Sequence, residues 1–226
     1  MPPTHRHSAS AADLASLGLG AGLTAPSPEV INEIERARVV DSLVAVAAAR
    51  GYGAVTVDRV LRHAHMSART FYRLFDSLED WGLAAYRLLA ARLQAELERA
   101  HHREQDWPAA IRTAIVAALA FAAREPAAAR FLASEIQAGG AEARALQAES
   151  IDRLATGLRE GRRLYPAAAG LHRLTERVIV AGAVSLIGDR LGVGEAQLLP
   201  NCEPELVELA LGPFLGAAEA RRFARA

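Results

Sequence analysis

Three pairs of histidines are the first residues whose spacing could do chemistry, because closely spaced imidazoles are common metal ligands. The pairs are His5/His7, His63/His65 and His101/His102. The chain has one cysteine, Cys202, and no matched set of carboxylates stands at ligand spacing beside a histidine pair. We therefore expect no metal centre, and the single cysteine also excludes an internal disulfide.

Three carboxylates, Glu149, Asp152 and Glu160, could in principle do acid–base work. They lie on an arginine-rich helical segment, where such residues are typical of a solvated, charged helix face. The glycine-containing stretch 182–194 lacks the Gly-Lys-Ser/Thr ending of a phosphate loop and follows a helix instead of a strand. With no catalytic triad or cofactor fingerprint, the sequence predicts neither an enzyme nor a bound cofactor.

Arginines carry the remaining chemistry, because a guanidinium can donate two parallel hydrogen bonds to O6 and N7 of guanine. All 26 basic residues are arginine, and 26 acidic residues balance them, so the formal net charge is zero. Residues 36–75, however, hold seven arginines and two aspartates, a local charge of +5. Any nucleic-acid face must be local, and we expect it in this segment.

Helical periodicity surrounds these arginines. Apolar residues recur at helical spacing in the segment 29–50, which Gly51-Tyr52-Gly53 ends. Thr56 can then cap a short helix that runs to Ala64, with an apolar face made by Val57, Val60, Leu61 and Ala64.

A break at His65-Met66 separates this helix from the next. Ser67 can cap the following helix, whose predicted buried residues are Phe71, Leu74 and Phe75. Two short helices joined by a turn of about four residues are the helix-turn-helix arrangement. The second helix of such a unit places its N-terminal residues against base edges in the major groove.

The residues across this unit resemble the DNA-binding domain of the tetracycline-repressor (TetR) family. The resemblance is carried by Gly51-Tyr52, Thr56-Val57, Ala64, Ser67-Ala68-Arg69-Thr70-Phe71-Tyr72 and Phe75. It implies a homodimeric transcriptional regulator whose two recognition helices read a near-palindromic operator in double-stranded DNA. It also implies a variable C-terminal domain that binds a small-molecule effector.

By position, the resemblance implies that DNA is contacted by Thr56, Ser67, Ala68, Arg69, Thr70, Tyr72 and Arg73. Ser67 and Thr70 would cap the helix and touch phosphate, and the Tyr72 hydroxyl would donate to a phosphate. Arg69 and Arg73 are then the expected base readers. The alternatives are a solvated arginine face and a half-buried tyrosine that only packs.

Three residues depart from the family pattern. His65 stands where a turn glycine is usual, Leu74 where a polar or aromatic residue is common, and Leu78 where a lysine typically begins the fourth helix. His65 fits if it adopts a left-handed conformation, which histidine tolerates better than most residues. Leu78 cannot supply a charged contact to phosphate.

Helix breakers divide the rest of the chain. Ser77 with Asp80 can begin a helix that runs to about His102, and Asp106 with Pro108 can begin another that ends before Pro126. Further helices are predicted for residues 126–139, 141–165, 171–191 and 204–223, the last with a kink at Gly212-Pro213.

The predicted fold is therefore all-α. A helix-turn-helix domain over residues 29–76 precedes a larger helical effector-binding and dimerisation domain over residues 77–226. Residues 1–28 are expected to form a disordered N-terminal arm.

The resemblance also implies which helices wall an effector pocket, and on these helices lie Trp107, Ile111, Ile115, Phe121 and Phe131. A mostly apolar lining would suit a hydrophobic or aromatic effector. The alternative for each residue is a place in the ordinary core.

A dimer interface is expected on the segment 171–191 together with the final helix. Leu171, Leu174, Val178 and Ala181 lie in helical register there, and the small residues that follow permit close helix approach. The alternative is an ordinary core helix.

After residue 28, the longest uncharged stretches are Thr113–Ala123 and Val178–Gly188, with 11 residues each. A membrane span needs about 20 residues. No compact apolar segment of a signal peptide follows the N-terminus. We therefore expect a cytoplasmic protein that does not enter a membrane.

Two functions from different classes follow. The first is a repressor that leaves its operator when an effector binds. The alternative is a helical small-molecule carrier or enzyme with a vestigial helix-turn-helix, which Leu78 and the zero net charge keep open.

Overall fold

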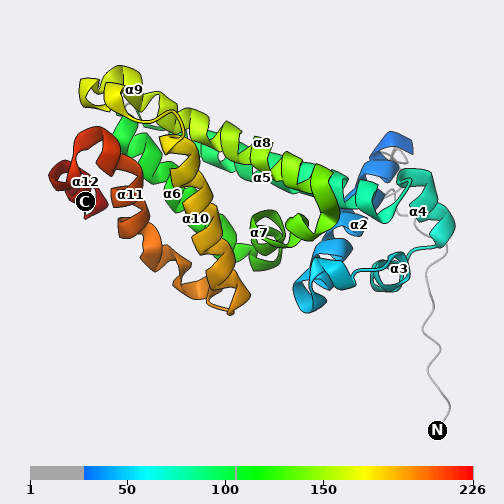
Figure 1. The fold of residues 1–226 in the computed structure, drawn as a ribbon. Coiled ribbons are helices and arrows are strands. Elements are labelled where there is room, and N and C mark those ends of the chain that lie inside the picture. The colour runs from blue at the N-terminus through cyan, green and yellow to red at the C-terminus, as the bar shows by residue number, and fades with distance from the viewer. Residues whose placement is uncertain (1–27, 105, 226) are drawn as a thin grey trace, which may run out of the picture. The chain divides into compact units, whose positions relative to one another are not determined.

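Figure 1 shows the computed structural model, which describes residues 28–104 and 106–225, with side chains from residue 35 onward. These residues form helices and turns, and none of them lies in a strand. By their contacts, the described residues divide into two units, with the division after Ala37. The predicted N-terminal arm, except for Pro28, lies outside the described residues.

The helix-turn-helix elements are present in the predicted order. Helix α2 (Pro28–Arg50) is followed by a 3-10 turn, η1 (Tyr52–Ala54), and then by α3 (Val57–Ala64) and α4 (Ala68–Leu74). The second unit begins within α2, where Val39, Leu43 and Ala47 lie at helical spacing and are fully buried.

The remaining helices form the larger part of the second unit. They are α5 (Leu78–His101), α6 (Trp107–Arg124), α7 (Pro126–Ala133), η2 (Glu135–Gly139), α8 (Gly140–Arg159), α9 (Gly161–Leu164), η3 (Pro166–Gly170), α10 (Thr175–Gly192), η4 (Ala196–Cys202), α11 (Glu203–Leu215) and α12 (Ala217–Ala224). Helices α5 and α8 pack along each other, and α10 crosses α7 and α8 (Figure 1). The all-α prediction is confirmed.

Helix α7 ends earlier than predicted. The side chain of Gln147 on α8 is buried and donates to the carbonyl oxygens of Leu132 (2.9 Å) and Ala133 (2.8 Å). Carbonyls at a helix C-terminus lack partners within the helix, so this amide satisfies the end of α7. Residues 135–139 then form the separate 3-10 segment η2.

The helix predicted for 171–191 begins only at Thr175. Leu171 is extended, and Arg162 on α9 donates to the carbonyl oxygens of Leu171 (2.8 Å) and His172 (2.7 Å). Arg162 also pairs with Glu176, which is almost completely buried. These bonds hold residues 171–174 outside the helix.

The chain bends after Pro213 rather than at Gly212-Pro213. Pro213 stays inside α11, and the break between α11 and α12 is at Gly216, with φ of 83°. Glycine populates this left-handed backbone region without the steric penalty of a side chain.

An apolar core runs through the predicted domain boundary at residues 76 and 77. The ring of Trp81 on α5 packs on Phe71 and Phe75, with centroids 5.3 and 6.0 Å apart. All three belong to one buried cluster that extends from α2 to η4 and Leu206. The helix-turn-helix therefore shares its core with the helices that follow.

One described helix, α6, has the length and composition that a membrane span requires. A core helix passes the same test, and α6 contributes Leu119, Phe121 and Ala122 to the buried cluster.

Candidate DNA-binding surface and ligand cavity

Side-chain caps set the start of each short helix. Thr56 Oγ1 accepts from the amide of Arg59 at 3.4 Å, and Ser67 Oγ accepts from the amide of Thr70 at 3.1 Å. The hydroxyls of Ser67 and Thr70 also lie 2.9 Å apart. Both predicted caps are confirmed, and they fix where α3 and α4 begin.

The turn between α3 and α4 depends on His65. Its φ and ψ are 51° and 46°, so the left-handed conformation expected from the missing glycine is present. Arg38 on α2 donates to the carbonyl oxygen of Ala64 at 3.1 Å and so closes the end of α3. The turn is therefore held from both sides.

Helix α4 buries Phe71 and leaves a polar face outside. Tyr72 is 60% exposed, with its ring packed edge-on against Phe71 at 5.1 Å. Ser67, Ala68, Arg69 and Arg73 are exposed, and Thr70 is half-buried. This face offers hydroxyl and guanidinium groups to a partner in solution.

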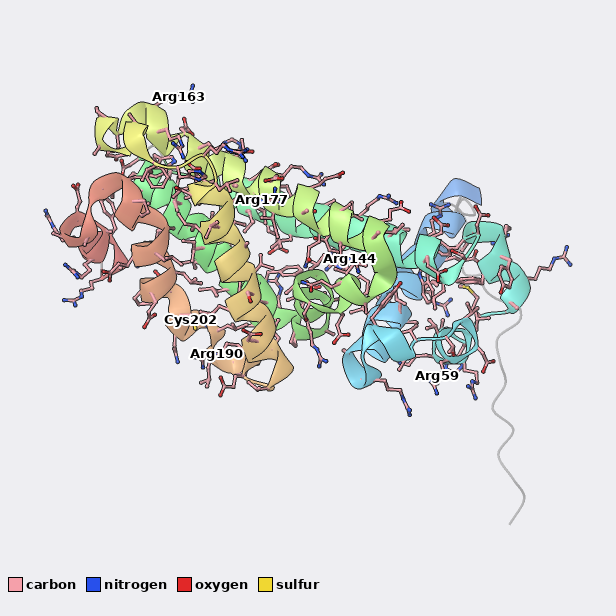
Figure 2. The ribbon with its side chains drawn as sticks, viewed as in Figure 1. Arg59, Arg144, Arg163, Arg177, Arg190 and Cys202 are labelled. Carbon is pink, nitrogen blue, oxygen red and sulfur yellow. The ribbon has the colours of Figure 1, made fainter. Side chains whose placement is uncertain are left out.

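Among the described residues, the arginines on α3, unlike Arg69 on α4, have hydrogen-bond or ion-pair partners close in sequence. Arg59, which extends from α3 in Figure 2, donates to the carbonyl oxygen of Ala54. Arg62 forms an exposed ion pair with Asp58 at 2.8 Å, one helical turn earlier.

Leu78 begins α5 directly after the Ser77 cap, whose hydroxyl accepts from the amide of Asp80 at 3.0 Å. The Leu78 side chain is half-buried and packs against the core cluster. Its apolar character thus has a packing role.

A polar junction joins the helix-turn-helix to α7 and η2. The amide of Tyr52 donates to Glu135 Oε2 at 2.7 Å, and Arg130 on α7 pairs with the same carboxylate at 2.6 Å. Arg130 also donates to the carbonyl oxygen of Ala48 at 3.5 Å, and the ring of Phe131 lies edge-on to Tyr52 at 5.5 Å. We call these five residues the α7 junction.

Sequence reasoning missed the α7 junction. Phe131 was assigned to the pocket, whereas it is fully buried against Tyr52 and is not among the residues on the cavity wall. The Gly51-Tyr52 pair of the family pattern was the signal that could have located the junction.

The larger helical part contains a cavity of about 450 Å³. Helices α5, α6, α7, α8, α10 and α11 line it, mostly with alanine, leucine, isoleucine and valine. Ile111, Ile115 and Phe121 of the predicted set lie on its wall. This volume is within the range of small-molecule sites, roughly 300 to 1,000 Å³.

Trp107 does not reach the cavity wall. Its ring packs between Tyr165 and Phe214, with centroids 5.5 and 5.1 Å away, and its Nε1 donates to the carbonyl oxygen of Gly157 at 2.9 Å. These contacts place Trp107 in a second core cluster.

A small polar group interrupts the apolar wall. It consists of Tyr86 on α5 and of Gln147, Ser150 and Arg153 on α8. Burial raises the pKa of Tyr86, while its hydrogen bond with Ser150 and the charge of Arg153 act in the opposite direction. Tyr86 is therefore a neutral hydroxyl at ordinary pH.

The predicted dimer residues differ in exposure. Val178 is 64% exposed and Leu174 is 38% exposed, whereas Leu171 and Ala181 are half-buried. Gly188 packs within the chain, where an added Cβ would stand 3.3 Å from that of Ala133. The small residues of α10 are thus divided between internal packing and open surface.

Two of the three carboxylates that the sequence places on a charged helix face, Asp152 and Glu160, form ion pairs. Asp152 lies 3.2 Å from Arg177 on α10, and Glu160 lies 3.5 Å from Arg163; Figure 2 labels both arginines. Among the residues that the structure describes, no three histidine, cysteine, aspartate or glutamate side chains gather as a metal site would require.

Both the sequence of the helix-turn-helix and the fold of the whole chain are similar to those of known proteins. The model of the family of bacterial regulatory proteins, tetR family, matches residues 39–80. A search of curated proteins finds no match. Among solved structures, the chain resembles the fatty acid degradation regulator FadR from Bacillus halodurans, with a TM-score of 0.69 and 17% identity over 84% of this chain and 97% of the other.

Two further structures share the fold. FadR from Bacillus subtilis in complex with stearoyl-CoA has a TM-score of 0.66 and 18% identity, covering 80% of this chain and 98% of the other. RolR in complex with resorcinol has a TM-score of 0.52 and 16% identity, covering 87% and 95%. Residues 39–80 therefore match the tetR family of bacterial regulatory proteins, and the chain as a whole shares the fold of these solved regulators.

Proposed function

We propose that the protein is a homodimeric repressor that binds a near-palindromic operator and leaves it when a small apolar effector fills the cavity. The observation that carries this proposal is the α7 junction. Helix α7 contributes Leu132 and Ala133 to the cavity wall and Arg130 and Phe131 to contacts with the helix-turn-helix.

In this proposal α4 enters the major groove of DNA. Arg69 and Arg73 read base edges, and Ala68 packs on a base because its methyl group allows close approach. Thr56, Ser67, Thr70 and Tyr72 hold phosphates through their hydroxyls, which sets the register of α4 on the duplex. Because such a regulator acts at the chromosome, we also propose a cytoplasmic location.

Release follows from the two faces of α7. An effector that pushes on Leu132 or Ala133 displaces the C-terminus of α7, where the Gln147 amide holds both carbonyl oxygens. Displacement of α7 carries Arg130 with it, and Arg130 contacts Ala48 and, through Glu135, the Tyr52 amide. When Ala48 and the Tyr52 amide shift, α2 and η1 shift with them. Helix α4 follows because it packs in the same core. The effector lowers DNA affinity only as far as it favours the displaced state.

The two ligand-bound neighbours support a cavity effector in this fold, since one holds stearoyl-CoA and the other resorcinol. The two ligands differ in chemistry. The effector class of this chain must therefore be inferred from the residues that line its own cavity.

A gel shift with the DNA that flanks the protein's own gene, run at two salt concentrations, tests the proposal. A regulator should bind this DNA more tightly than random DNA, and its affinity should fall steeply as salt rises. The variant with both Arg69 and Arg73 changed to alanine is the matched control and should lose the preference. Binding that is equal on both DNAs would reject the operator.

The carrier alternative predicts ligand binding without any specific DNA complex. Its main sequence support was Leu78, and that support is weaker once Leu78 is seen to pack against the core. We therefore keep the repressor as the proposed function.

A further inference from the structure

The charged residues on the cavity wall are Arg87, Glu98 and Arg153, and they differ in how they are satisfied. Arg87 stands 3.8 Å from Glu142, and Glu98 accepts a hydrogen bond from Gln94 at 2.8 Å. Arg153 forms no ion pair and no side-chain hydrogen bond with any residue in 35–104 or 106–225. Among the three charged wall residues, Arg153 is therefore the one without a side-chain partner in the described residues.

The carboxylates near Arg153 on α8 do not pair with it. Glu149 stands one helical turn earlier, which is the usual place for a partner on a helix. Asp152 is next in sequence but pairs with Arg159 (3.8 Å) and Arg177 (3.2 Å). Arg153 instead lines the cavity together with Tyr86 and Ser150, and the Ser150 hydroxyl donates to the carbonyl oxygen of Leu146 at 3.1 Å.

The depth of the wall residues gives the cavity a direction. Arg153 is exposed, so the polar group reaches solvent at the mouth. The most deeply buried wall residues are Leu119, Phe121 and Ala122 on α6, and Ala129 and Leu132 on α7 are buried as well. A ligand would therefore have a charged end near Arg153 on α8 and an apolar end near α6 and α7.

The apolar part of the wall favours an aliphatic ligand over an aromatic one. Phe121 and Tyr86 are the two aromatic rings on it, and the other apolar residues are aliphatic. Aromatic ligands gain most from stacked or edge-to-face rings, which this wall offers at few places. An alkyl chain needs only contact with apolar surface.

We propose that the cavity binds an aliphatic chain with an anionic head group, with the head group held by Arg153 and the chain directed toward α6 and α7. This inference rests on the proposed function, since it names the effector class of the same cavity. A guanidinium binds a carboxylate or phosphate with two parallel hydrogen bonds, so both head groups share the required chemistry. The chain end would lie against Ala129 and Leu132, on the cavity face of α7.

Isothermal titration calorimetry of the full chain with single-chain amphiphiles tests this proposal. Octanoate, decanoate and dodecanoate should bind with increasing affinity, about fourfold for each added methylene group, because each buries about the same apolar area. Dodecanoate should bind at least about tenfold more tightly than 1-dodecanol, which has the same chain and no charge. Dodecyl phosphate tests which anionic head group Arg153 prefers.

Arg153→Gln should remove the preference for dodecanoate over 1-dodecanol and leave the binding of the alcohol nearly unchanged. Arg153→Lys should keep part of it, because the positive charge remains. Arg144→Gln is the matched control: Arg144 lies on the same helix (Figure 2) but not on the cavity wall, so this variant should behave as the wild type. Circular dichroism confirms that each variant is folded.

Two results would overturn the proposal. One is equal binding of dodecanoate and 1-dodecanol to the wild type, and the other is tighter binding of resorcinol than of dodecanoate. Calorimetry needs no DNA, so the proposed function can fail independently. A protein that binds dodecanoate through Arg153 but shows no operator binding keeps this inference and loses the repressor.

Discussion

At the scale of single residues, the exposed face of α4 separates side chains that can read bases from those that can only hold phosphate. Arg69→Ala and Arg73→Ala should each weaken operator binding by about 1 to 3 kcal/mol if the guanidinium bonds a guanine. Tyr72→Phe removes one hydroxyl and should weaken binding to operator and random DNA about equally. Fluorescence anisotropy with both DNAs measures the difference. Equal losses on both DNAs for the arginine variants would make them phosphate contacts.

Leu78 permits a second test at this scale. Leu78→Lys would place a charge in the first turn of α5, where backbone amides already favour an anion. The long side chain can keep its stem against the core while its ammonium group reaches water. Binding to any DNA should strengthen, and the slope of log K against log salt should steepen by about one unit. An unchanged slope in a folded variant would show that this helix end does not face DNA.

Gly82 on α5 lies so close to Tyr52 that a side chain has no room at this position. A Cβ at this position would stand 1.9 Å from the Tyr52 hydroxyl oxygen, and Tyr52 is itself buried and packed on Phe131. Gly82→Ala should therefore lower the free energy of unfolding by about 1 to 3 kcal/mol. Gly53→Ala is the control, since no atom lies within 4 Å of its added Cβ. Equal urea midpoints for the two variants would contradict this close fit.

At the scale of elements, the α7 junction should hold the helix-turn-helix in place. Glu135→Gln removes the charge that pairs with Arg130 and should lower the free energy of unfolding by about 1 to 3 kcal/mol, because both groups are largely shielded from water. Operator affinity should fall with it, since η1 loses its anchor. Glu96→Gln breaks the more exposed pair with Arg124 and should cost less than about 1 kcal/mol. If urea denaturation shows equal losses of unfolding free energy for the two variants, the α7 junction does not anchor the helix-turn-helix.

The elements also show what sequence could and could not predict. The starts of α3, α4 and α5 were predictable because each cap joins residues three positions apart: Thr56 with Arg59, Ser67 with Thr70, and Ser77 with Asp80. The left-handed turn at His65 was likewise a local inference.

The errors arose where the partner is distant in sequence. Gln147 ends α7 from 14 and 15 residues away, and Arg162 holds Leu171 outside α10. Trp107 and Phe131 have the composition of pocket residues, yet Phe214 and Tyr52 place them in the core. Arg153 gave no signal in the sequence, because its neighbours Glu149 and Asp152 made it look like part of a charged face.

At the scale of the whole molecule, we expect two copies to associate through α10 and α11. Val178 is 64% exposed on α10, and Leu209 is 49% exposed on α11, so both present apolar surface to a second copy. Val178→Asp should give a monomer in size-exclusion chromatography with light scattering. Val116→Asp, on the exposed side of α6, is the control and should remain dimeric. A monomeric wild type at micromolar concentration would refute this interface.

The central claim is that α4 reads a specific operator, and sequencing the DNA fragments that the purified protein selects from its source genome tests it most directly. The account predicts one enriched, near-palindromic motif, with half-sites about one helical turn or a multiple of it apart, as expected for a dimer. The motif should disappear when Arg69 and Arg73 are both changed to alanine. Selected fragments that share no motif would contradict the claim.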